Sequence, residues 1–210
     1  MTLFDYKFIQ ERIKIMDDDH VEKHNAKFPK NHKNHFRTDL KPCPFEGNLE
    51  QAKVIFLLAN PSCSDQSTEA DHEPINGWGI WGLSSEANES MRGWWRPRIR
   101  QFVKDEGNEE EWRSLSQKIA SFQAIPWASR NFHECNRLPS KKYILEILEQ
   151  VIEKNKNAIF VVVRQRAYWL ELLEKKGARK VFTKTPRCSY ISKGNIETEA
   201  DWNLLKSVLA

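Results

Sequence analysis

The stretch Lys53-Val-Ile-Phe-Leu-Leu-Ala-Asn-Pro-Ser62 is an apolar run that ends abruptly at Asn60 and Pro61. Uninterrupted β-branched and aliphatic residues from 54 to 58 are typical of a short strand buried on both faces of a parallel sheet. Pro61 cannot donate a hydrogen bond to a neighbouring strand, and it restricts Asn60 to an extended or turn conformation. This run therefore predicts a central strand of an α/β sheet.

The end of this strand is also a candidate ligand site. Ligands of open α/β sheets bind at the carboxyl ends of strands, and the Asn60 amide can both donate and accept hydrogen bonds there. Asn-Pro-Ser is equally an ordinary turn sequence. The motif alone leaves both interpretations open.

Length and composition indicate one globular domain behind an N-terminal extension. The chain has 210 residues, of which 40% are hydrophobic and 30% are charged, so a sizeable core and a solvated surface are both expected. The net charge of +4 permits binding to nucleic acid without requiring it. No apolar stretch has the length of a membrane span, and residues 1–16 lack the features of a secretory signal.

The cysteines indicate a reduced protein. They are Cys43, Cys63, Cys135 and Cys188, and no two of them form a Cys-x-x-Cys pair. A zinc ribbon or an iron–sulfur cluster is therefore not expected. Free thiols favour a cytoplasmic location.

The N-terminal extension, residues 1–42, combines a helical apolar stripe over 3–16 with a polar segment that continues to residue 38. Asp17, His20 and His24 could share one helix face and bind a metal. A solvated helix face explains them as well, and no further ligand has a recognisable spacing. We predict no metal.

Alternating strand and helix patterns follow along the chain. The expected strands lie at 54–58, 121–127, 158–163 and 180–183, and the helical patterns at 109–119, 140–152, 167–176 and 198–209. Within the segment 92–103, a further helix is expected to begin near Pro97. This alternation predicts a parallel sheet with helices on both faces. A long loop, from residue 62 to about 90, contains Trp78 and Trp81, and loops of this length are commonly functional.

Polar loops follow three of the four expected strands. They are Asn60-Pro-Ser62, the segment from Arg130 to Arg137, and Thr185-Pro-Arg187. The carboxyl ends of parallel strands meet at one edge of a sheet, so we expect these loops to line one cleft.

In these motifs, over roughly residues 43 to 209, the chain resembles the uracil-DNA glycosylase superfamily. Leu58-Ala-Asn-Pro-Ser62 is similar to the first motif of the mismatch-specific branch, and Asn136-Arg-Leu-Pro139 is similar to a motif of other branches. Arg164-Gln-Arg-Ala167 and Thr185-Pro-Arg187 stand at the positions of two later motifs. The resemblance implies a three-layer α/β/α sandwich with a four-stranded parallel sheet, formed by residues 43–210.

The resemblance also implies a monofunctional DNA glycosylase, which hydrolyses the N-glycosidic bond of a base flipped out of duplex DNA. We expect a monomer without a cofactor. Asn60 and Thr185 are the expected catalytic residues. The base is expected to contact Ala59, Pro61, Ser62, Trp78 and Trp81, and the DNA to contact Arg130, Arg137, Arg164, Pro186, Arg187 and Ser189. For Trp94 and Trp95, at a helix start, we expect core packing.

Departures from the superfamily pattern concern the leaving base. Thr185 replaces a His or Asn that binds it, Arg187 replaces a serine, and the Asp that activates water in the most efficient uracil enzymes is missing. Glycines at 77, 79 and 82 leave space between Trp78 and Trp81, which favours a bulky modified base. Because some members of the superfamily act in antiviral defence, the resemblance is compatible with hydroxymethylated or glucosylated cytosine of phage DNA as that base. The loop would equally suit a cover over a hydrophobic edge.

Two alternative functions stay open. One is a non-catalytic DNA- or nucleotide-binding module on the same fold, which the substitution at Thr185 favours. The other is a hydrolase of free nucleosides or nucleotides.

Overall fold

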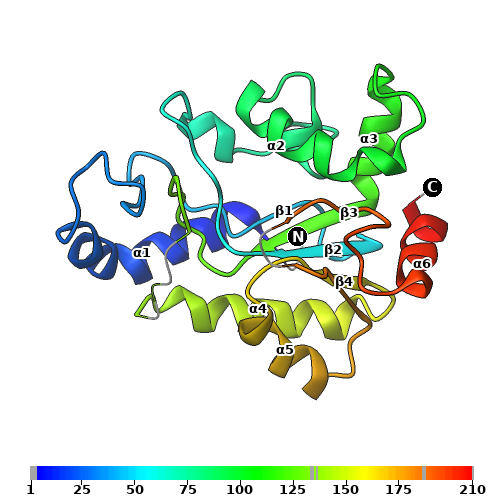
Figure 1. The fold of residues 1–210 in the computed structure, drawn as a ribbon. Coiled ribbons are helices and arrows are strands. Elements are labelled where there is room, and N and C mark those ends of the chain that lie inside the picture. The colour runs from blue at the N-terminus through cyan, green and yellow to red at the C-terminus, as the bar shows by residue number, and fades with distance from the viewer. Residues whose placement is uncertain (1–3, 133–134, 136, 186–187, 210) are drawn as a thin grey trace.

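A five-stranded mixed sheet forms the centre of the computed structural model (Figure 1). The structure describes residues 4–132, 135, 137–185 and 188–209. The strands are β1 (Phe45–Glu46), β2 (Val54–Leu58), β3 (Ile119–Gln123), β4 (Ile159–Val162) and β5 (Lys180–Phe182), in the spatial order β1-β3-β2-β4-β5. The neighbouring pairs β3–β2, β2–β4 and β4–β5 are parallel, whereas β1 runs antiparallel to β3. The predicted α/β class is confirmed.

The sheet differs from the prediction by its fifth strand, so it is mixed rather than a four-stranded parallel sheet. β1 has only two residues and follows Pro44, and so short a segment carries no alternating pattern. Its register places Glu46 opposite Ser121 of β3. The missed strand therefore brings a carboxyl group to the edge of the sheet where the site lies.

Helices cover both faces of the sheet. α1 (Tyr6–Asn25), α4 (Ser140–Lys154) and α5 (Arg166–Lys175) pack on one face, and α2 (Glu89–Ile99), α3 (Glu109–Lys118) and α6 (Glu199–Leu209) on the other. Figure 1 shows α4 and α5 beneath the sheet and α2 and α3 above it. Within the described residues, no helix has both the length and the apolar character of a membrane span.

β2 is buried on both faces, as its composition predicts. Val54, Phe56 and Leu58 contact the core on the side of α2, α3 and α6, while Ile55 and Leu57 contact the core on the side of α1, α4 and α5. All five residues are at most 5% exposed. Since burying one large aliphatic side chain stabilises a fold by about 1.5–3 kcal/mol, this strand anchors the site that follows it.

The N-terminal helix α1 packs against the same core. Ile9 and Ile13 are buried beneath the sheet. The buried carboxylate of Asp17 accepts hydrogen bonds from Trp127 Nε1 and from the backbone N–H of Ser140, both at 2.9 Å. Asp17 thus occupies the N-terminus of α4. Among the described residues, no group of three His, Cys, Asp or Glu side chains could hold a metal.

Candidate functional site

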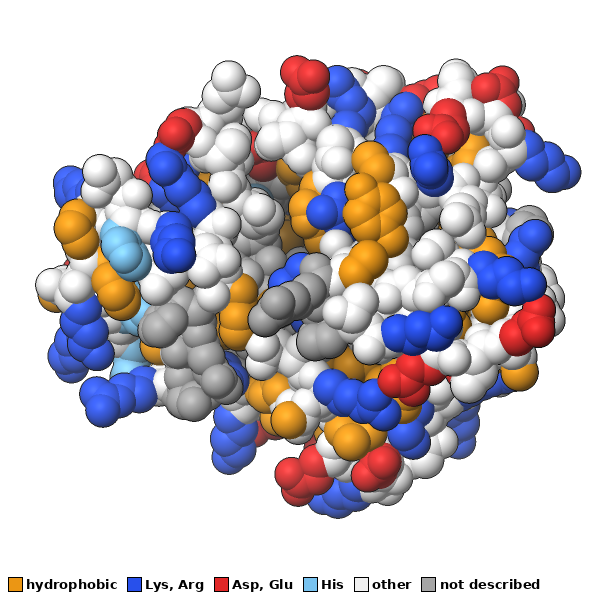
Figure 2. Space-filling view, in the orientation of Figure 1, with side chains coloured by type: hydrophobic (Ala, Val, Ile, Leu, Met, Phe, Trp, Pro, Cys, Tyr) orange, Lys and Arg blue, Asp and Glu red, His pale blue; other side chains and the backbone are white. Residues whose placement is uncertain are grey.

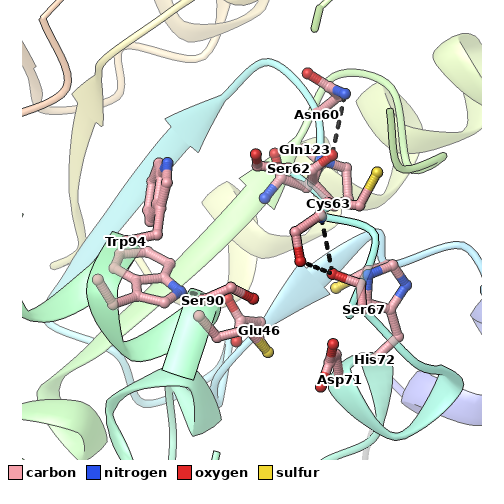
Figure 3. Close-up of a pocket in the computed structure, with 15 residues that line it drawn as sticks. Glu46, Asn60, Ser62, Cys63, Ser67, Asp71, His72, Ser90, Trp94 and Gln123 are labelled. Atoms are coloured by element: carbon pink, nitrogen blue, oxygen red, sulfur yellow. Dashed lines mark hydrogen bonds between the residues drawn. The ribbon is translucent and has the colours of Figure 1, made fainter. Parts of the chain in front are cut away.

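A cavity of about 130 Å³ lies at the carboxyl ends of β2 and β3, the edge where a ligand site is expected (Figure 3). Its lining comes from the β1 region (Cys43, Glu46), from the end of β2 and the following loop (Asn60, Pro61, Ser62, Cys63, Ser64, Ser67), from the 3-10 helix Glu69–His72 (Asp71, His72), from α2 (Ser90, Met91, Trp94, Trp95) and from the end of β3 (Gln123). The predicted site residues Asn60, Pro61 and Ser62 are therefore brought together there.

The amide of Asn60 is held in one orientation. The segments after β2 and β3 run side by side, with a backbone hydrogen bond of 2.8 Å from Ile125 N–H to Ala59 O. This pairing places Ser129 next to Asn60, whose NH2 group donates to Ser129 Oγ at 2.9 Å and to Pro61 O at 3.1 Å. Ser129 Oγ in turn donates to Asn131 O. The NH2 group is thereby occupied, and the Oδ1 atom is the part of Asn60 that remains for a ligand or water.

Trp94 and Trp95 form an aromatic wall of the cavity. Their ring centroids are 4.8 Å apart and the rings are nearly perpendicular. Trp95 is buried, whereas Trp94 is half-buried and has the guanidinium of Arg98 above its ring, 4.3 Å from the centroid. Both tryptophans pack with the core, as expected, and both also line the cavity with Asn60.

Trp78 and Trp81 lie elsewhere. Both are buried in the core, and Trp81 Nε1 donates to Asp71 O at 3.1 Å. They line a separate hollow of about 620 Å³ beside Tyr6 and Phe45. The structure therefore does not bring them to the cavity that contains Asn60, and we do not propose a stacking role for them.

The glycines between these tryptophans serve close packing rather than an open pocket. A Cβ atom on Gly79 would lie 2.1 Å from Ser116 O, and one on Gly82 would lie 2.4 Å from Trp95 Cδ1. Gly82 consequently allows Trp95 to take its place in the wall.

We expect Gly82→Ala to lower the free energy of unfolding by about 1–3 kcal/mol, because the added methyl group overpacks the site of Trp95. Gly93→Ala is the matched control. Gly93 is exposed within α2 and a Cβ there meets nothing within 4 Å, so the substitution should stabilise by about 0.5–1 kcal/mol. Urea unfolding of both variants measures the difference. Equal stability of the two would contradict the packing role of Gly82.

Asp71 and His72 add an acid and an imidazole to the cavity, opposite Trp94 in Figure 3. Asp71 Oδ2 accepts a 3.0 Å hydrogen bond from Thr68 N–H. Burial lowers the pKa of His72, so its ring is neutral at pH 7. Its Nδ1 is hydrogen-bonded to the carbonyl oxygen of Lys41 and must carry the ring proton, which leaves Nε2 as a proton acceptor.

Glu46 brings a buried carboxyl group to the cavity. Its Oε2 accepts a hydrogen bond from Trp95 Nε1 at 2.9 Å. Burial raises the pKa of Glu46 to about 7, although the hydrogen bond from Trp95 acts in the opposite direction. The group therefore titrates near neutral pH.

None of the predicted DNA-binding residues that the structure describes lines the cavity. Ser189 is buried and its Oγ accepts a 2.7 Å hydrogen bond from Arg98 Nε. Burial, and to a smaller extent the nearby charge of Arg164, lower the pKa of Arg98, so Arg164 lies in the same neighbourhood.

The remaining predicted DNA-binding residues within the described part of the chain are Arg130 and Arg137. Arg130 forms an ion pair with Asp65, and Arg137 is exposed. Thr185 follows β5 and does not line the cavity. Pro186, Arg187 and Asn136 are outside the described residues.

Sequence reasoning missed Glu46, Asp71, His72 and Gln123. Asp71 had a local signal, since Thr68-Glu-Ala-Asp71 is a capping box, a motif that fixes the start of a helical turn. Gln123 is a polar residue at the end of a mostly apolar strand, which also could have indicated a site. Nothing local indicates Glu46.

Together these features describe an α/β protein with a partly polar, aromatic-walled cavity at the carboxyl ends of its parallel strands. No protein-family model matches the sequence, and no curated protein matches it.

Proposed function

We propose that this protein is a DNA glycosylase, which hydrolyses the N-glycosidic bond of a nucleotide flipped out of DNA. The observation that carries the proposal is the fixed amide of Asn60 at an aromatic-walled cavity, at the carboxyl end of β2. A flipped base needs a planar apolar surface, a few polar groups at its edge and a water held near the sugar. In this proposal the Trp94 ring is the apolar surface, the polar side chains of the lining contact the edge of the base, and Asn60 Oδ1 orients the water.

A single heteroaromatic ring fits the size of the cavity. Cavities of about 150 Å³ in other proteins hold a benzene ring, and this one measures about 130 Å³. Trp94 is half-buried at its wall, so its ring is available to a base. The proposal places the base here rather than between Trp78 and Trp81.

The chemistry follows from the groups on the lining. Water forms a bond to the sugar C1′, and the C1′–N bond breaks with its electron pair leaving on the base. Asn60 Oδ1 orients this water, since its NH2 group is committed to Ser129 and Pro61. Neutral His72 accepts the water proton at Nε2. The departing base afterwards takes up a proton from solvent.

DNA would be held by selected basic residues rather than by a continuous basic face. Figure 2 shows Lys and Arg side chains scattered among Asp and Glu on the face in view. Arg164, which follows β4 and lies near Arg98, is the arginine to which we assign a phosphate contact. An action on phage DNA in the cytoplasm stays a prediction of the sequence resemblance.

Duplexes that each carry one modified base test the proposal. We expect release of at least one base, detected as an alkali-labile abasic site, from DNA but not from mononucleotides. The panel should contain uracil, thymine opposite guanine, and cytosine with hydroxymethyl or glucosyl groups. Tight duplex binding without any base release would favour the non-catalytic module, and release from mononucleotides alone would favour a nucleoside hydrolase.

A further inference from the structure

Three polar atoms in and beside the cavity have no hydrogen-bond partner among the described residues. They are Glu46 Oε1, Ser121 Oγ and Gln123 Oε1. Their residues are at most 5% exposed. Buried polar atoms are normally satisfied, and each exception calls for an explanation such as a ligand or bound water.

These residues form one row on the sheet. Glu46 on β1 lies directly opposite Ser121 on β3, so both side chains stand on the same face. Gln123 follows Ser121 by two positions and shares that face, because side chains alternate along a strand. Glu46 and Gln123 both line the cavity, and the row therefore ends in it.

One oxygen of the Glu46 carboxyl group is bound within the protein, and the other is buried without a partner among the described residues. Trp95 Nε1 donates to Oε2, which leaves Oε1 without a partner among the described residues. The Oε1 atom of Gln123 likewise has no hydrogen-bond partner among the described residues. When Glu46 is ionised, the two unsatisfied oxygens can both only accept hydrogen bonds, and the N–H groups of a ligand are suitable donors.

We infer that Glu46 and Gln123 bind the amino-bearing edge of a cytosine-type base held in the cavity. The inference rests on the proposed function, and it names the class of base. It goes further because it assigns substrate discrimination to two residues that the motifs do not contain.

Cytosine matches this pair of oxygens better than uracil does. Its exocyclic amino group supplies two N–H donors, and carboxylates are suited to accept from the N4 group of cytosine. The NH2 group of Gln123 can donate to the acceptor atoms N3 and O2 of the same ring edge. Uracil has a carbonyl oxygen in place of the amino group, which would oppose the oxygen of Glu46 without a hydrogen between them.

Equilibrium binding to uncleavable DNA tests this discrimination directly. Each duplex carries one 2′-fluoro-arabino nucleotide, whose glycosidic bond resists hydrolysis, opposite an abasic position. One duplex has cytosine there, the second has uracil, and a third has an abasic analogue that reports phosphate contacts alone. The measurement is made at pH 8, where the carboxyl group of Glu46 is ionised because its pKa is about 7.

The wild-type protein should bind the cytosine duplex about tenfold or more tightly than the uracil duplex. Glu46→Gln should abolish this preference, because the amide oxygen would accept from Trp95 and the NH2 group would face the amino group of the base. The exposed Glu86→Gln is the matched control and should keep the preference. All three proteins should bind the abasic duplex equally.

Several results would overturn the inference. Equal binding of cytosine and uracil by the wild-type protein would do so, and so would an unchanged preference in Glu46→Gln. If base release is nevertheless detected, the proposed function stands and only the choice of base falls. No release and no binding beyond the abasic duplex would remove both. If Glu46→Gln fails to fold, Gln123→Leu provides the same comparison, with loss of preference expected.

Discussion

Replacing Asn60 with alanine is expected to slow base release by roughly 100-fold or more while the protein remains folded. The loss of a single group that acts in the transition state commonly has this effect. Asn60→Ala removes Oδ1, the atom that is left to orient water once the NH2 group has bound Ser129 and Pro61. Its structural cost should be only about 1 kcal/mol, since the lost hydrogen bonds lie at a half-buried position.

Single-turnover base release measures this effect, with circular dichroism as the test of folding. Asn203→Ala is the matched control, because Asn203 is exposed on α6, away from the cavity lining. It should release base at the wild-type rate. An Asn60→Ala protein that is as fast as Asn203→Ala would remove Asn60 from the mechanism.

The central strand and its end could be predicted from sequence because their signal is local. The run at 54–58 matches β2, and Pro61 follows the strand as expected. The run places Asn60 where parallel strands end, and the structure puts Asn60, Pro61 and Ser62 on one cavity. A buried strand and its termination depend on a few consecutive residues, so one segment contains the whole pattern.

The other residues that line the cavity with Asn60 could not be predicted in the same way, because they come from segments far apart in the sequence. Glu46 reaches the site through a two-residue antiparallel strand, and Trp95 reaches it through a contact that Gly82 permits. The tryptophans illustrate the difficulty. A Trp flanked by glycines suggests open space in a sequence, yet in the structure Gly79 and Gly82 allow the close approach of Ser116 and Trp95. Burial of Trp78 and Trp81 follows from tertiary packing.

Glu46 is expected to make the stability of the protein fall as pH rises toward neutral. Its pKa is about 7 in the folded protein, against an ordinary value of 4.5, and burial is the main cause. The folded state therefore holds the proton more tightly than the unfolded state does. The resulting stability is fully present below about pH 4.5 and is lost as pH rises through about 7. A difference of about 2.5 units corresponds to roughly 3 kcal/mol.

Glu46→Gln isolates this contribution, because glutamine keeps the shape of the neutral acid and cannot ionise. At pH 4 the variant and the wild-type protein should have similar free energies of unfolding in urea. At pH 8 the variant should be more stable by roughly 3 kcal/mol, since the wild-type protein must then bury a carboxylate. Burial also raises the pKa values of neighbouring Cys43 and Tyr6, which stay neutral over this range. Glu86→Gln, at an exposed position, should follow the wild-type pH dependence. A constant difference between wild type and Glu46→Gln from pH 5 to 8 would show that Glu46 does not titrate in this range, and that its Oε1 atom presents the same hydrogen-bonding character to a ligand throughout.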